Sequence, residues 1–347
     1  MKVSFKTILS VVTLVMVVLI LFFSRHQLEH AWHLLSQVNL WMLGAVALCT
    51  VLSYLFSGEM MFSYLRQKQS IKEVSLLTLM RVSLELNFVN HILPSGGVSG
   101  VSYANWRLGK LGVTTAKSMM SQAVRYAAGF AATIVLLMIS LVVVTIDGNV
   151  NRWIILMSAL LVIGMGGAVS LFVYVVKSRS RIHRFGDWLQ RTTNRLARVA
   201  TRGRKRKIIK ADNIVKLFDD LHRDYIELNR DKSVLAQPFI WALLFIASDI
   251  AIFFLTFLAL GAVVNPAAIL IAYSLASLAG FAIVTPGGAG AYEALMVMVL
   301  VTAGMQQGEA IAGVVLARVI ILLITIGIGY IFYQLTLNKY GKRAADL

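Results

Sequence analysis

Charged residues are scarce in this sequence, at 14% of 347 residues, whereas apolar residues make up 58% and the mean hydropathy is +0.77. So few charges cannot cover the surface of a soluble domain of this length. The single cysteine, Cys49, excludes an internal disulfide and carries no information about the compartment. The composition therefore excludes a soluble fold and predicts an all-α polytopic membrane protein.

Only four prolines are present, and two of them belong to glycine-rich turns within apolar sequence. A backbone that leaves helical hydrogen bonding inside a bilayer is tolerated only where it is buried in protein or lines a wet cavity. We therefore expect both turns to form walls of such a cavity. The first turn consists of Pro94, Ser95, Gly96 and Gly97, and the second, about 190 residues later, of Pro286, Gly287, Gly288 and Gly290.

Basic residues are missing from some loops and concentrated in others. Residues 177–233 carry 17 Lys and Arg against 7 Asp and Glu, whereas the loops 261–265 and 304–309 contain neither Lys nor Arg. Basic loops stay on the cytoplasmic side, so we expect residues 177–233 and both termini to be cytoplasmic. Apolar residues punctuate the charges of this segment, which predicts an amphipathic surface for anionic lipid. We expect no nucleic acid as a partner, because the run 201–207 lacks aromatic stacking platforms.

The apolar runs predict six membrane spans and two hairpins around the Pro-Gly-Gly turns, each hairpin either re-entrant or fully spanning. No small-residue cleavage site follows the run 8–23, so we expect it to be retained as the first span. The expected order is a first span and outer segment over 1–37, a first repeat over 38–146 with a cytoplasmic-side hairpin at 74–104, a connecting span over 147–176, the basic segment 177–233, a second repeat over 234–337 with an outer-side hairpin at 266–303, and a cytoplasmic tail over 338–347.

The two hairpins are expected to belong to an inverted repeat. Three spans separate them, and an odd number of spans inverts the second hairpin relative to the first. Arg125 lies 31 residues after Pro94, and Arg318 lies 32 residues after Pro286. Glu59 lies 35 residues before the first of these prolines, and Asp249 lies 37 residues before the second. Inverted repeats around broken helices are typical of transporters that bind their substrate near the bilayer midplane.

Charged residues inside the expected membrane segments are the strongest chemical signal. Each costs about 2.5–3.5 kcal/mol on insertion scales unless it finds a partner or water, so we take them as candidates for substrate binding. Arg125 and Arg318 have no carboxylate close in sequence, and therefore need an anionic ligand or a distant partner. The candidates are Arg81, Glu85, Arg125, Asp249, Glu293 and Arg318.

Structural roles are the alternative for each of these residues. Arg81 and Glu85 stand four residues apart on one expected helix and could neutralise each other. Glu293 opens the helix after the second turn, where a carboxylate can cap exposed amides. Distant pairing of Arg125 with Glu293, or of Arg318 with Glu85, would satisfy the two arginines without any ligand.

In order and spacing, these residues resemble a known family, the lysylphosphatidylglycerol synthase transmembrane region. The resemblance covers most of residues 8–337 and is carried by Leu93 to Gly100, by Pro286-Gly287-Gly288 with Gly290 and Glu293, and by Arg125 and Arg318. That family includes the lipid-flipping membrane portion of the bacterial multiple peptide resistance factor. Many relatives have an acidic residue and an arginine after the first Gly-Gly, where this sequence has Val98 and Ser99. The resemblance implies translocation of a phospholipid or lipid-linked headgroup across a bacterial-type cytoplasmic membrane.

No pattern in the sequence points to catalysis. Only ten residues follow the last expected span, so we expect no soluble aminoacyltransferase domain, no catalytic residues and no cofactor. We expect no metal at membrane depth, although His26, His30 and His33 lie near one helical face and could form a weak site. Two other functions stay open, an integral membrane transferase acting on a polyprenyl-phosphate or glycolipid, and a scaffold that transports nothing.

Overall fold

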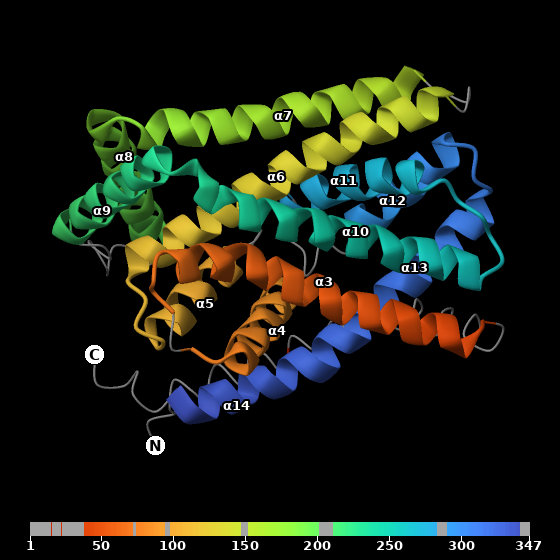
Figure 1. Cartoon of the computed structure of the whole chain (residues 1–347), viewed down its shortest axis with the longest axis horizontal. Helices are drawn as coiled ribbons and strands as arrows, with labels where there is room; N and C mark the ends of the chain where they lie inside the picture. The colour runs from red at the N-terminus through yellow and green to blue at the C-terminus, as the bar shows by residue number, and fades with distance from the viewer. Residues whose placement is uncertain are drawn as a thin grey trace.

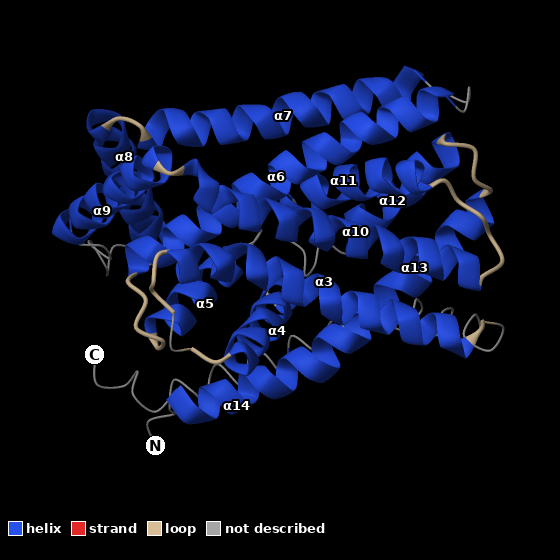
Figure 2. Cartoon of the chain, viewed as in Figure 1, coloured by secondary structure: helices blue, strands red, loops and turns tan. Residues whose placement is uncertain are grey.

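A computed structural model of the chain describes residues 15, 22, 38–71, 74–93, 98–146, 152–200, 211–282 and 290–340. The described part is built from helices and contains no strand (Figure 2). Five of its helices are long and apolar enough to cross a membrane. The protein is therefore an all-α polytopic membrane protein, as the composition predicts. The expected first span, 8–23, lies outside the described residues except for Val15 and Phe22, so it stays a prediction.

The first half contains a long helix, a helical hairpin and a second long helix. These are α3 (Leu40–Gln67), α4 (Leu76–Ile92), α5 (Val98–Gly109) and α6 (Thr115–Ile146). Asn39 caps α3, because its side chain accepts a hydrogen bond of 2.9 Å from the Trp41 amide. Ser75 caps α4 in the same way through the Thr78 amide. The start of each helix is thus encoded by a short polar side chain directly before an apolar run.

The second half repeats this order of elements. It contains α10 (Ala236–Ala259), α11 (Pro266–Ala282), α12 (Ala291–Thr302) and α13 (Gln307–Ile324). A π-helical turn, Thr325–Gly329, joins α13 to α14 (Tyr330–Tyr340), and the three form one continuous span. Pro266 stands at the first position of α11, where its missing amide and fixed φ are tolerated. The expected hairpin over 266–303 therefore covers α11 and α12.

Three helices connect the halves. α7 (Arg152–Val176) crosses beside α6, and α8 (Arg179–Ala200) and α9 (Ala211–Arg230) pack on each other at one end of the molecule (Figure 1). A 3₁₀ turn, Lys232–Leu235, then leads into α10. The described part of the basic segment expected over 177–233 thus consists mainly of two amphipathic helices, α8 and α9, at one end of the molecule.

The two halves are similar in helix lengths and packing. Both hairpins consist of a 17-residue helix followed by a 12-residue helix. α3 and α10 lie against each other at the centre and run in opposite directions (Figure 1). The first hairpin helix of each half packs on the last long helix of the other half, α11 on α6 and α4 on the π-helical turn and α14. Each half therefore supplies a wall for the hairpin of the other.

The short second helix of each hairpin limits how the hairpin can sit in a bilayer. At 1.5 Å per residue, the 12 residues of α5 or α12 extend about 18 Å. The hydrocarbon core is about 30 Å thick, so neither helix is long enough to cross it. Whether the hairpins are re-entrant, and from which side each enters, stays a prediction.

Glycine allows two pairs of helices in the core to approach closely. A Cβ atom on Gly58 of α3 would lie 1.8 Å from the Ser83 Oγ of α4. A Cβ on Gly313 of α13 would lie 2.1 Å from the Phe257 ring of α10. Since no hydrophobic effect drives helices together in lipid, such close contact is a main source of packing energy. The helices that surround the centre of the molecule are thereby held in fixed positions.

Candidate functional site

A cavity of about 320 Å³ lies between the two halves. Helices α3, α4 and α6 of the first half and α10 to α13 of the second half contribute to its wall, together with Met165 of α7. Its volume is at the lower end of the range for small-molecule sites. The polar residues that line it are Thr50, Ser53, Tyr54, Ser57, Asn87, Asn90, His91, Arg125, Tyr126, Thr133, Asp249, Tyr273, Ser274, Ser277, Tyr292 and Arg318.

Arg318 enters this cavity from α13 and is held by Glu293. Its Nε donates a hydrogen bond of 2.7 Å to Oε1 of Glu293, and its guanidinium lies 4.4 Å from the centre of the Tyr292 ring. The other carboxylate oxygen accepts a 2.7 Å hydrogen bond from the amide of Gly290, whose φ of +90° suits glycine. Glu293 thus caps α12, which is the structural alternative to its expected role in substrate binding, and it also fixes Arg318. The hypothesis that Arg318 pairs with Glu85 is wrong.

Arg125 enters the cavity from α6 of the opposite half. Its Nη2 donates a hydrogen bond of 3.2 Å to the Tyr126 hydroxyl, and its guanidinium lies 4.9 Å from the centre of the Tyr126 ring. Within the described ranges Arg125 forms no ion pair with a carboxylate, so the hypothesis that it pairs with Glu293 is wrong. Arg125 therefore faces the cavity without an ion-pair partner among the described residues.

Asp249 is the third charged residue in the cavity wall. It lies on α10, and its two carboxylate oxygens accept hydrogen bonds from the hydroxyls of Ser53 on α3 and Tyr273 on α11. In the described part of the chain no Lys, Arg or His side chain forms an ion pair with it. The structure thus brings Arg125, Asp249 and Arg318 together at one cavity, from three different helices.

Glu85 lies away from the cavity in a separate buried cluster. Its side chain is 1% exposed and accepts hydrogen bonds from Arg107 Nε at 3.0 Å, the Tyr103 hydroxyl at 2.8 Å and Thr336 Oγ1 at 2.5 Å. These donors belong to α5 and α14, so the carboxylate connects both helices of the first hairpin to the last helix of the chain. Glu85 therefore has the environment of a structural residue.

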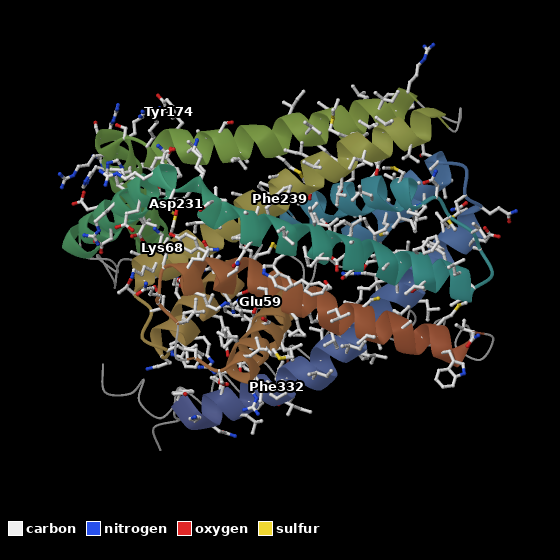
Figure 3. The ribbon with its side chains drawn as sticks, in the orientation of Figure 1. Glu59, Lys68, Tyr174, Asp231, Phe239 and Phe332 are labelled. Carbon is white, nitrogen blue, oxygen red and sulfur yellow. The ribbon has the colours of Figure 1, made fainter. Side chains whose placement is uncertain are left out.

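The predicted pairing of Arg81 with Glu85 is wrong. Arg81 is exposed, and its guanidinium lies 5.6 Å from the centre of the Phe332 ring on α14, which Figure 3 labels. The ion-pair partner of Glu85 is Arg107. Arg107 is buried within α5. Nothing close to it in the sequence indicates that it pairs with Glu85.

The glycine-rich turns themselves, Pro94 to Gly97 and Pro286 to Gly288, lie outside the described residues, as do His26, His30 and His33. The residues beside the turns do reach the cavity, since Leu93 precedes the first turn and Tyr292 follows the second. Within the described ranges no group of three His, Cys, Asp or Glu side chains is arranged to hold a metal ion.

Several cavity residues were not predicted from the sequence, although a signal for some of them is present. Thr50, Ser53 and Ser57 follow a spacing of three and four residues and therefore form a polar stripe along one face of an apolar span. Such a stripe in a membrane helix indicates contact with a polar partner or with water. Tyr273 and Tyr292, within the apolar second hairpin, are a weaker signal of the same kind.

The basic helices α8 and α9 carry their own ion pairs. Arg179 Nε and His183 Nε2 each lie 2.9 Å from Oδ1 of Asp219. These hydrogen bonds, from Arg179 first and His183 second, hold the pKa of the Asp219 carboxyl below its usual range. Phe185 and Trp188 stack on each other and are exposed. Side chains ending in nitrogen gather around this end of the molecule (Figure 3).

Comparison with known proteins adds a family to this description. No curated protein and no solved structure matches the sequence. The family described as "Lysylphosphatidylglycerol synthase TM region" matches residues 7–329, a range that includes both hairpins and every residue of the cavity. The protein therefore belongs to the lysylphosphatidylglycerol synthase transmembrane-region family.

Proposed function

We propose that the protein translocates a phospholipid or a lipid-linked headgroup across a bacterial-type cytoplasmic membrane, through the cavity between its halves. The observation that carries this proposal is Arg125, whose guanidinium lines an intramembrane cavity without a carboxylate partner in the described part of the chain. A guanidinium stays charged when poorly hydrated, and its planar donors match phosphate oxygens. A family named for a phospholipid synthase supports a lipid phosphate as the anion.

Arg318 provides a second phosphate site in this proposal. It occupies the position in the second half that corresponds to Arg125 in the first, and both line the same cavity. In transporters built from inverted repeats, the site near the midplane opens to the two sides of the membrane in turn. The phosphate would contact Arg125 in one state and Arg318 in the other, which avoids the cost of leaving its charge unpaired at membrane depth.

The proposal includes an orientation. The basic helices α8 and α9 lie on the cytoplasmic surface against anionic lipid, both termini are cytoplasmic, and the two hairpins are re-entrant from opposite sides. The exposed Phe185 and Trp188 beside basic side chains support a surface of this kind, because aromatic rings prefer the headgroup region.

A scaffold without transport is the second candidate, and one observation favours it. The Arg318–Glu293 and Arg107–Glu85 pairs satisfy two membrane arginines without any ligand. A scaffold, however, gives no reason to keep Arg125 charged in a cavity wall. An integral membrane transferase finds no such support, and no catalytic activity is proposed.

The test uses the full-length protein in vesicles that contain a fluorescent phosphatidylglycerol, with a quencher that bleaches only the outer leaflet. Translocation exposes the inner-leaflet probe to the quencher. Arg125→Gln should slow this exchange about 10- to 100-fold, because a charge-assisted hydrogen bond contributes about 1.5–3 kcal/mol. Arg125→Lys should also be slow, since an ammonium lacks the planar fork.

Arg81→Gln is the matched control, because Arg81 lies on a neighbouring membrane helix but does not line the cavity. It should exchange lipid at the wild-type rate. The scaffold would be favoured if fluorescence is lost no faster with the wild-type protein than in protein-free vesicles, both for phosphatidylglycerol and for any other anionic lipid. Equal rates for Arg125→Gln and Arg81→Gln would refute the assigned role of Arg125.

A further inference from the structure

Apart from Glu309, which is exposed in the first turn of α13, one carboxylate of the described membrane helices differs from the others. Glu59, Glu85 and Glu293 each form an ion pair with an arginine. Asp249 alone has only hydroxyl partners, Ser53 and Tyr273. An arginine keeps its partner ionised, because the pair exists only while both groups are charged. Among the carboxylates of the described membrane helices that are not exposed, Asp249 is therefore the one whose contacts do not fix its charge.

The two partners of Asp249 can satisfy either of its protonation states. A hydroxyl donates one hydrogen bond and also accepts hydrogen bonds. While Asp249 is ionised, the hydroxyls of Ser53 and Tyr273 donate to its oxygens. When it is protonated, one hydroxyl turns and accepts the new O–H. No side chain has to move far, and both carboxyl oxygens keep a partner, so a proton can bind and leave at low structural cost.

The charges around the cavity provide a reason for Asp249 to bind a proton when a headgroup is present. Arg125, Arg318, Asp249 and Glu293 together sum to zero when all are ionised. A phosphodiester headgroup brings one further negative charge into a region where each unpaired charge costs about 2.5–3.5 kcal/mol. One proton on Asp249 restores neutrality, and no other described carboxylate at the cavity is without an arginine.

We propose that Asp249 is a proton-binding site that couples headgroup movement to proton movement, an inference that rests on the proposed function. A proton from water on one side binds a carboxylate oxygen as the phosphate reaches the arginines. It returns to water on the other side when the headgroup leaves. No covalent bond to the lipid forms or breaks. The other titratable or charged groups that face this space are Tyr54, His91, Arg125, Tyr126, Tyr273, Tyr292 and Arg318.

His91 also lines the cavity, and its imidazole is a second group there that can bind a proton. It lies on α4, and its Nδ1 is 2.8 Å from the backbone oxygen of Asn87. A histidine that charges would add a positive charge and so also favour the anion at low pH. The experiment therefore needs a variant at each residue.

The first measurement is binding of short-chain phosphatidylglycerol to the full-length protein in detergent, from about pH 5 to about pH 8. Binding to the wild type should weaken by up to about tenfold per pH unit as the pH rises, because the proton and the lipid bind together. Asp249→Asn should bind equally at every pH. His91→Gln should keep the wild-type slope, and so should Glu59→Gln, the control at a carboxylate outside the cavity.

The second measurement needs neither lipid nor a folded Asp249→Asn variant. Infrared difference spectroscopy on the wild type should show one carboxyl band that appears as the pH falls. Ser53→Ala should shift the frequency of this band, because it removes a hydrogen bond but keeps the carboxyl.

Three results would overturn the inference while lipid binding persists: an unchanged slope in Asp249→Asn, loss of the slope in His91→Gln, or a sodium dependence at constant pH that replaces the pH dependence. Absence of the infrared band would have the same meaning. Absence of binding at every pH, for phosphatidylglycerol and for a polyprenyl phosphate, would instead end the proposed function and the coupling with it.

Discussion

The pair formed by Arg318 and Glu293 allows structural and ligand-binding roles of the two arginines to be separated by measurement. Arg318→Gln removes the donor that lies 2.7 Å from Oε1 of Glu293, while the Gly290 amide still donates to Oε2. Arg125→Gln, in contrast, removes a guanidinium whose described contacts are to Tyr126 only. The first substitution leaves a carboxylate without its counter-charge, and the second does not.

The expected cost follows from the burial of the pair. Removing one partner of a buried ion pair costs about 3–5 kcal/mol. The Arg318 and Glu293 side chains are 16% and 12% exposed, so the lower end, about 3 kcal/mol, is appropriate. With an unfolding entropy of about 2.1 cal/mol/K per residue over 347 residues, this corresponds to a fall in Tm of about 4 °C. Loss of the Arg125 contact to Tyr126, at about 0.5–1 kcal/mol, lowers Tm by about 1 °C.

Thermal unfolding in detergent, followed by the fluorescence of the six tryptophans, measures both values. Adding Glu293→Gln to Arg318→Gln should recover most of the fall in Tm. Adding Glu293→Gln to Arg125→Gln should lower Tm by the sum of the two single effects. Anionic lipid at about 100 times its Kd should stabilise the wild type by about 2.7 kcal/mol, and Arg125→Gln should lose this response. A loss in Arg125→Gln as large as that in Arg318→Gln, with the lipid response intact, would refute the reasoning.

Three further predictions concern the fold. Arg107→Met should cost about 3–5 kcal/mol, because it leaves the buried Glu85 charge without its cation, and adding Glu85→Gln should restore stability in urea or detergent unfolding. Gly313→Val should cost about 1–3 kcal/mol because its Cβ would lie 2.1 Å from the Phe257 ring, whereas Gly308→Val, with open space around it, should cost less than Gly313→Val. In a Cys49→Ser background, a cysteine at Gln306 should react with an impermeant reagent in intact cells and one at Ser233 only after permeabilisation; the reverse pattern would invert the proposed topology.

The membrane helices could be predicted from the sequence because hydropathy and length alone decide them. The expected hairpin over 266–303 begins with α11 and ends one residue after α12, and the expected connecting span over 147–176 ends at the last residue of α7. Helix ends lie where Ser75, Asn265 or a proline breaks the apolar pattern, and these signals are local. A bilayer leaves few other folds available to such runs.

The pairing of the charged residues could not be predicted, because it depends on contacts between distant segments. Glu85 contacts Arg107, 22 residues away, and Thr336, 251 residues away. Asp249 contacts Ser53 across 196 residues. Helical spacing favours the pair Arg81 with Glu85, but packing turns Arg81 outward and Glu85 inward. Arg107 lies only three residues before Lys110, and its burial depends on the contact with Glu85, which the local sequence does not indicate.

The last described span connects the two hairpins through its π-helical turn. Arg318, before the turn, is held by Glu293 of the second hairpin, and Thr336, after it, is held by Glu85 of the first. Within the turn, Thr325 bonds the Tyr54 hydroxyl of α3, and a Cβ on Gly329 would lie 2.6 Å from Phe88 of α4. π-Helical turns inside α-helices are rare and occur often at functional sites. In the proposed transport cycle, we therefore expect a shift of one hairpin relative to the other to be absorbed at Thr325–Gly329.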